Sequence, residues 1–165
     1  MEPIFVLDCE FNKHRTIKEI GISFVIELDD GKYIAARPPD HHLIRLGNPG
    51  DANGGFTGKI SLLGACEVLK NMGAQDKMWA SWGTGDRHEL KRQTEDEGLE
   101  MPVGYFHIDI APMYAALMAL NRPIRLKKAA EELTGRFYGA QHHADDDSYN
   151  AARILAHLMN QFDRS

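Results

Sequence analysis

The sequence lacks the features that mark a secreted, disulfide-rich or membrane protein. Its two cysteines, Cys9 and Cys66, are too few for a disulfide framework or a zinc site. The longest apolar run is residues 110–120, which is about half of the roughly 20 residues that a membrane helix needs. The N-terminus has neither the basic start nor the long apolar stretch of a signal peptide, so we expect a cytoplasmic protein without membrane contact.

Positive charge is also scarce, because the formal net charge is −5 at pH 7. A protein that coats duplex DNA neutralises many phosphates with Lys and Arg, so the charge balance argues against that class. It does not exclude a nuclease that holds a few nucleotides through metal ions.

The composition that remains is typical of a globular protein. The chain has 165 residues, of which 43% are hydrophobic and 26% charged, and a chain of this length buries about two-thirds of its unfolded surface. It contains no internal repeat, low-complexity segment or linker, so we expect a single domain over residues 1–165.

Apolar alternation predicts strands at residues 3–7, 20–26 and 32–36, with Asp29, Asp30 and Gly31 as a tight turn. Residues 37–58 are rich in Gly and Pro and predict an irregular loop. Helical periodicity follows at residues 62–69, 110–117, 126–133 and 144–159, with Gly135 as a C-cap, and short strands are predicted at 77–82 and 105–108. The predicted fold is α/β, with a mixed five-stranded sheet, an antiparallel meander of its first three strands, and flanking helices.

Two carboxylates lie near the end of the first strand. Asp8 and Glu10 are two residues apart, so their side chains share a face. Side by side on a buried strand they repel each other and lose hydration, and they stay ionised if a cation lies between them. The alternative is that the strand ends here and both residues face water.

Further acidic residues and two histidines occur at helix starts. Asp147 lies on the apolar stripe of the last helix, which predicts an inward carboxylate unless the first turn is frayed. Asp86 and Glu89 form a pattern that is typical of a capping box, in which Asp86 caps a helix. A functional role is compatible with this one, because a helix cap also lies at the end of the preceding strand, where ligands bind in α/β sheets. His142 or His143 could take a proton from water beside such a cluster, or either could be a plain loop residue.

These residues, in this order, resemble the three motifs of the DnaQ-like superfamily, in particular its DEDDh branch of 3′-to-5′ exonucleases. Asp8 and Glu10 match the first motif, Asp86 the second, and His142 with Ala144 and Asp147 the third. The last segment is similar to a subgroup that contains histone-mRNA and small-RNA 3′-end exoribonucleases and the sporulation inhibitor KapD. Residues 19–21 and 82–83 fit that subgroup too.

The resemblance implies a ribonuclease-H-like fold and a two-metal exonuclease. Four carboxylates would hold two Mg²⁺ or Mn²⁺ ions, namely those of Asp8, Glu10, Asp86 and Asp147. His142 would be the general base and His143 its rival. The substrate would be the 3′ end of a single strand, RNA favoured over DNA, and the products nucleoside 5′-monophosphates, with the enzyme a monomer or homodimer.

Substrate contacts are predicted at Phe11, Asn12 and Thr57, and Phe11 could pack on the terminal base. Phe11 and Asn12 stand where many relatives have a small residue and a threonine, and residues 56–58 only loosely match the Leu-Thr-Gly of the family. Three alternatives to an exonuclease remain: a catalytically silent binding module, a regulatory protein, and a phosphodiesterase for small nucleotides.

Overall fold

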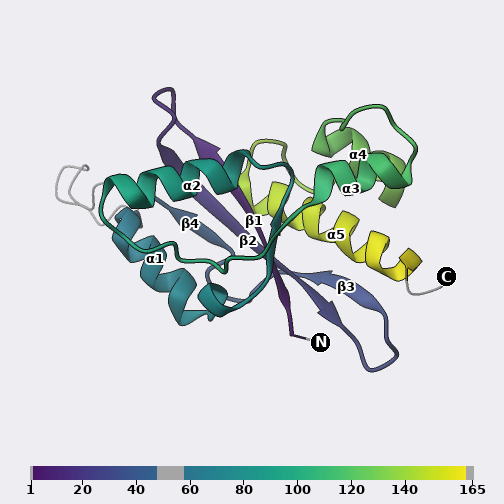
Figure 1. Ribbon diagram of the computed structural model, residues 1–165, viewed down its shortest axis with the longest axis horizontal. Helices are drawn as coiled ribbons and strands as arrows, with labels where there is room; N and C mark the ends of the chain where they lie inside the picture. Colours follow the sequence, from purple (N-terminus) through teal and green to yellow (C-terminus); the bar gives the residue numbers. More distant parts are fainter. Residues whose placement is uncertain (1, 48–57, 163–165) are drawn as a thin grey trace.

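The computed structural model describes residues 2–47 and 58–162, so the predicted substrate contact Thr57 lies outside the described residues. Figure 1 shows a central sheet with helices on either side. In chain order the elements are β1 Ile4–Phe11, β2 Ile17–Glu27, β3 Tyr33–Ala36, β4 Leu43–Arg45, α1 Leu62–Asn71, a 3-10 turn Ala74–Asp76, β5 Trp79–Ser81, α2 Gly85–Asp96, β6 His107–Asp109, α3 Ile110–Leu117, α4 Leu126–Thr134 and α5 Ala144–Phe162.

The sheet is mixed, as the sequence predicted. Its main path runs β3-β2-β1-β5-β6. β1, β2 and β3 form the antiparallel meander, and the β1–β2 register places Asp8 opposite Gly21. β5 pairs in parallel with β1, and β6 pairs in parallel with β5. The carboxyl end of β1 therefore points the same way as the end of β5, which leads into α2.

One strand lies where the sequence predicted irregular structure. β4 falls within residues 37–58 and pairs antiparallel with β2, with Ile44 opposite Ile20, so the sheet has six strands and not five. Ile44 is buried in the core. A strand of three residues among prolines and glycines has little local signal, and its pairing with β2 is a tertiary interaction that periodicity does not detect.

Both faces of β1 are buried, which makes it the central strand. Phe5 and Leu7 belong to a core under α1 and α2, whereas Ile4 and Val6 belong to a second core under α3, α4 and α5. Each large apolar side chain that is fully buried contributes roughly 1.5–3 kcal/mol. The two cores hold β1 rigidly, and with it the polar residues at its end.

Helix ends follow local sequence signals. The Ser61 side chain accepts a hydrogen bond from the Gly64 N–H at 3.1 Å and caps α1, and Asp109 caps α3 in the same way through Ala111. Gly135 ends α4 with a φ of 82°, as predicted, because a side chain would be strained there. Among residues 2–47 and 58–162, no helix combines the length and apolar character needed to cross a membrane.

Candidate active site

The end of β1 places two carboxylates on one face of the sheet. Asp8 and Glu10 alternate with the buried Leu7 and Cys9, so they lie on the face that α5 covers. The register of β1 against β2 shifts between Glu10 and Phe11. The predicted shared face is therefore present, and the strand does not end before Glu10.

α5 brings the third carboxylate to this face. Asp147 is buried in the first turn of the helix, on the same side as Ile154 and Leu155, so the prediction of an inward carboxylate is confirmed. The Asp147 carboxylate accepts a hydrogen bond from the backbone N–H of His142 at 3.0 Å. This bond holds the loop that precedes α5, and with it His142, next to the Asp147 carboxylate.

The close approach of α5 depends on Gly21. A side chain at this position would place its Cβ only 1.8 Å from the Ala144 carbonyl oxygen at the start of α5. Gly21 lies opposite Asp8 in the sheet. Because position 21 has no side chain, the first turn of α5 lies directly on β2 and brings Asp147 toward Asp8.

Asp86 reaches the cluster from α2, but it does not cap that helix. α2 begins at Gly85 after Thr84, whose side chain makes no capping bond, so the predicted capping box is wrong. Glu89 pairs instead with Arg92 at 2.9 Å and with Arg15 at 3.3 Å. Asp86 is buried one residue inside the helix, where the backbone N–H of Cys9 bonds to it.

Burial and mutual repulsion disfavour charge on these carboxylates. Burial, followed by the charges of Asp86, Asp147 and Glu10, raises the pKa of Asp8 well above its usual range. Burial also raises the pKa of Asp86 to about 7, although the Cys9 N–H lowers it. Burial raises the pKa of Asp147 to about 6, opposed by the hydrogen bond from His142. The four side chains form one electrostatic unit from β1, α2 and α5.

Two oxygens in this unit lack a hydrogen-bond partner. They are Oδ2 of Asp8 and Oδ1 of Asp147, the buried side-chain atoms without a partner in the part of the chain that the structure describes. Such oxygens are costly unless something satisfies them. Ligand atoms of Glu10, His142 and Asp147 also lie within 4.8 Å of one another. A divalent cation with oxygen ligands fits this donor set.

The two adjacent histidines lie in different surroundings. Nδ1 of His142 is 3.7 Å from Oε1 of Glu10, and the His142 side chain is 76% exposed at the rim of the cluster. His142 adopts a φ of 66°, a conformation that is uncommon for a residue with a side chain. His143 instead lies with Asp145 and Asp146. The geometry therefore places His142, and not His143, beside the carboxylate unit.

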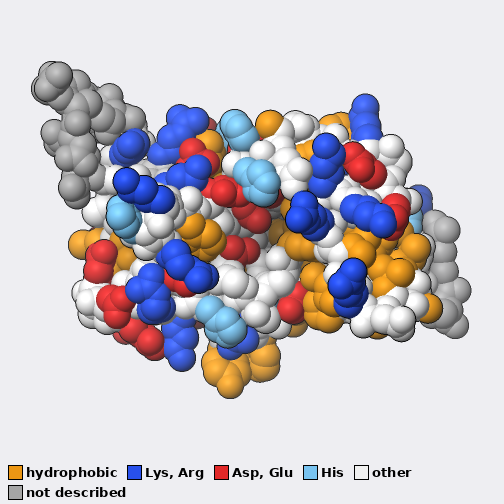
Figure 2. All heavy atoms as spheres, turned by 90° about the horizontal axis from the view of Figure 1, so that it is seen from above, with side chains coloured by type: hydrophobic (Ala, Val, Ile, Leu, Met, Phe, Trp, Pro, Cys, Tyr) orange, Lys and Arg blue, Asp and Glu red, His pale blue; other side chains and the backbone are white. Residues whose placement is uncertain are grey.

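A cleft of about 560 Å³ opens above the carboxylates. Figure 2 shows acidic side chains in a hollow in the middle of one face, with histidine at its edge and basic side chains on both sides. The cleft is lined by Asp8, Glu10, Trp82, Arg125, Leu126, Gln141, His142 and Asp147. Asp86 is buried and does not line the cleft.

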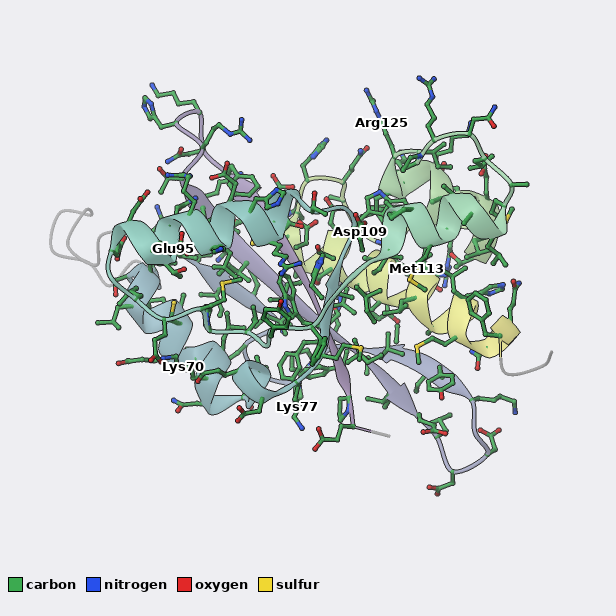
Figure 3. The ribbon with its side chains drawn as sticks, in the orientation of Figure 1. Lys70, Lys77, Glu95, Asp109, Met113 and Arg125 are labelled. Atoms are coloured by element: carbon green, nitrogen blue, oxygen red, sulfur yellow. The ribbon has the colours of Figure 1, made fainter. Side chains whose placement is uncertain are left out.

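Sequence reasoning missed Arg125, which precedes α4 and projects on the upper side of the molecule (Figure 3). Its side chain makes no capping bond. Within its own segment it looks like any exposed cation, and only the packing of α4 beside α5 brings it to the cleft. Trp82 and Leu126 give the same cleft an apolar wall, and Trp82 in turn packs on Tyr114, with ring centroids 5.9 Å apart.

Two of the predicted substrate contacts do not line the cleft. Phe11 packs against the core under α1 and α2. The Asn12 side chain accepts hydrogen bonds from the N–H groups of His14 and Thr16, at 2.8 and 3.0 Å, and so holds the turn between β1 and β2. Asn12 borders a separate pocket with Thr16 and Gln93.

The fold is similar to that of a known nuclease domain. A crystal structure of the nuclease domain of 3′hExo, described as a DEDDh family member and bound to rAMP, superposes with a TM-score of 0.60. The two chains are 19% identical, and the alignment covers 96% of this chain and 91% of that one. No protein-family model matches the chain, and no curated protein sequence matches it either. The chain therefore has the ribonuclease-H-like fold of a DEDDh nuclease domain.

Proposed function

We propose that the protein is a metal-dependent 3′-to-5′ exonuclease that acts on single-stranded nucleic acid, RNA in preference to DNA, and releases nucleoside 5′-monophosphates. The observation that carries the proposal is the convergence of four carboxylates from β1, α2 and α5 under an open cleft, with buried oxygens of Asp8 and Asp147 left without partners. The bound rAMP of the 3′hExo nuclease domain is consistent with a nucleotide in this cleft.

Asp8, Glu10, Asp86 and Asp147 would hold two divalent cations, Mg²⁺ or Mn²⁺. Such ions, when bound, stabilise both the attacking and the leaving oxygen of an in-line phosphoryl displacement. Asp86 does not line the cleft, but its charge interacts with those of Asp8, Glu10 and Asp147, so it would add negative charge to the site that holds the cations. The cation requirement follows from the burial and the mutual repulsion that together raise the three aspartate pKa values.

His142 is the proposed general base. Its ring lies at the rim of the cluster beside Glu10, where it can take a proton from a water that attacks the terminal phosphodiester. The hydrogen bond from its backbone N–H to Asp147 fixes the loop at this position. A positioned imidazole of this kind contributes roughly 10² to 10⁴-fold to the rate.

Other cleft residues would hold the terminal nucleotide. Arg125 offers a guanidinium to a phosphate, a contact that is often bidentate. Trp82 and Leu126 offer apolar contact to the sugar and base and reduce the access of water. Phe11 does not line the cleft, so it would contact the terminal base only if that base extended beyond Glu10.

Matched RNA and DNA strands with a 5′ label would test the proposal. We expect stepwise shortening from the 3′ end with Mn²⁺, no digestion with EDTA, faster digestion of RNA, and 5′-monophosphate products. The Asp8→Asn variant should be inactive, because one cation ligand is lost. Retention of most activity by this variant would contradict the two-metal assignment. Binding without digestion would indicate a silent binding module, and cleavage of dinucleotides alone would indicate a small-nucleotide phosphodiesterase.

A further inference from the structure

A second groove lies between α2 and the segment that leads into β6. Its volume is about 380 Å³. One wall is α2, through Arg87, Lys91 and Glu95, and the other is the 99–105 segment, through Met101 and Tyr105. Figure 3 shows Glu95 on α2. We refer to this feature as the upstream groove.

Two exposed aromatic side chains adjoin the upstream groove: Tyr105 lines it, and Phe106 is the next residue in the chain. Tyr105 is 84% exposed and Phe106 70%, more than the other large apolar residues that the structure describes as exposed. Their ring centroids are 5.5 Å apart, in an edge-to-face arrangement. Exposed neighbouring aromatic rings on a globular protein indicate a binding surface.

The backbone beneath these rings is fixed. Nε1 of Trp79 donates a hydrogen bond to the Gly104 carbonyl at 2.9 Å, and the Trp79 N–H donates to the Phe106 carbonyl at 3.2 Å. Gly104 has no room for a side chain, since a Cβ would lie 2.1 Å from the Lys77 carbonyl oxygen. The aromatic pair is thus presented by a rigid support, so a ligand that stacks on it does not have to order the backbone.

The helical wall supplies positive charge. Arg87 and Lys91 are four residues apart and therefore share a face of α2. Lys91 makes an exposed ion pair with Glu95 at 3.6 Å, a contact that contributes little and that a phosphate can displace. Arg87 makes no ion pair with another described residue. The groove therefore carries two cations against one carboxylate, on a chain whose net charge is −5.

The first turn of α2 links the carboxylate unit to the upstream groove. Asp86 belongs to the carboxylate unit, and the next residue, Arg87, lines the groove. Successive helix residues point about 100° apart, so one turn of α2 serves both sites. Figure 2 shows basic side chains and a histidine between the acidic centre and hydrophobic side chains that project at the lower edge.

We propose that the upstream groove binds the part of a single-stranded nucleic acid that precedes the 3′ end in the cleft. Arg87 and Lys91 hold its phosphates, and its bases stack on Tyr105 and Phe106, which is how proteins bind single strands without sequence preference. The proposal rests on the proposed exonuclease function and adds to it a preference for strands over dinucleotides.

Equilibrium binding tests the groove apart from turnover. The probe is a fluorescent 12-nucleotide RNA with a 3′-phosphate, measured by anisotropy in Ca²⁺. Tyr105→Ala should weaken binding by roughly 5- to 150-fold, the range expected for one stacked base. Arg87→Gln should lower the slope of log K against log salt by about 0.7, the value for one phosphate contact on a single strand.

Matched controls lie away from the groove. Phe162→Ala removes an exposed aromatic at the end of α5, and Lys32→Gln removes a charge from the turn between β2 and β3. Both should bind like the wild type. Unchanged affinity and unchanged salt slope in Tyr105→Ala and Arg87→Gln would overturn the proposal and point to a protein partner for the aromatic pair.

Turnover separates this inference from the proposed function. Tyr105→Ala should raise KM for a 12-nucleotide RNA at least fivefold more than for a dinucleotide, with kcat less affected than KM. If the wild type digests RNA and the variants digest the long strand equally well, the groove assignment is wrong and the exonuclease function stands. If the wild type digests nothing but Tyr105→Ala weakens binding, the groove stands and the exonuclease function fails.

Discussion

Replacement of Asp86 by asparagine should stabilise the metal-free protein at pH 8. The wild-type carboxyl has a pKa of about 7 in the folded protein and 3.8 as its ordinary value, mainly because it is buried. Three pKa units correspond to about 4 kcal/mol of cost once the group is ionised. Asparagine has nearly the same shape, carries no charge, and can still accept a hydrogen bond from the Cys9 N–H.

The sign of the pH dependence follows from proton binding. Between pH 3.8 and about 7 the folded protein holds a proton on Asp86 that the unfolded chain has released. The contribution of Asp86 to the free energy of unfolding is therefore full below pH 3.8 and is lost as the pH rises from 3.8 through about 7. Asp147, with a pKa of about 6, adds to the loss in the same window. Wild type and Asp86→Asn should accordingly be closer in stability at pH 5 than at pH 8.

Thermal unfolding in EDTA at pH 5 and pH 8 measures this effect. A gain of about 4 kcal/mol at pH 8 corresponds to roughly 10 °C in Tm for a domain of this size. Mn²⁺ at a hundredfold excess over its Kd should add about 2.7 kcal/mol to the free energy of unfolding of the wild type and so raise its Tm, and it should raise the Tm of Asp86→Asn less. Asp30→Asn is the control, because hydrogen bonds from Lys32 lower the pKa of the exposed Asp30 and outweigh the small opposing effect of burial.

A wild-type Tm that does not change between pH 5 and pH 8 in EDTA would refute the reasoning. So would a Tm of Asp86→Asn at pH 8 that is equal to or below that of the wild type. Either result would mean that Asp86 is not buried beside the other carboxylates in the metal-free protein.

Three further predictions concern the approach of α5, the base and the direction of digestion. Gly21→Ala should destabilise the protein by several kcal/mol and reduce Mn²⁺ affinity, since its Cβ would meet the Ala144 carbonyl; an unchanged Tm and metal affinity would contradict the packing argument. His142→Ala should lower kcat roughly 10² to 10⁴-fold with little effect on the Mn²⁺-induced Tm shift, and His143→Ala should be much milder; an inactive His143→Ala beside an active His142→Ala would move the base. A 3′-phosphate or a 3′-terminal hairpin should block digestion, and cutting of a circular single strand would refute the exonuclease assignment.

The sequence predicted those parts of the site that depend on local periodicity. Alternation on β1 placed Asp8 and Glu10 on one face, and the helical stripe of α5 placed Asp147 inward; both placements agree with the structure. Asp86 was assigned to a cap because an Asp followed three residues later by Glu fits a helix start. The helix in fact starts at Gly85, two residues earlier than a cap at Asp86 implies, and the Gly-Thr-Gly sequence at residues 83–85 does not reveal this start.

Features that depend on tertiary packing were not predicted. β4 exists through its pairing with β2, and its three residues have no periodicity of their own. Arg125 reaches the cleft only because α4 packs beside α5. The role of Asn12 in the turn after β1 also escaped prediction, since an Asn in that place is equally suited to bind a substrate or to hold a turn.

The carboxylate unit joins parts of the chain that are far apart in sequence. Asp8, Asp86 and Asp147 come from the beginning, the middle and the end of the chain, so an ion held between them closes two long loops. Closing a long loop removes conformational freedom from the unfolded chain, and the ion would act as a reversible cross-link between α2, α5 and the central strand. Its release would therefore free both helices at once, and resistance to proteolysis would follow metal occupancy across the whole domain and not only around the cleft.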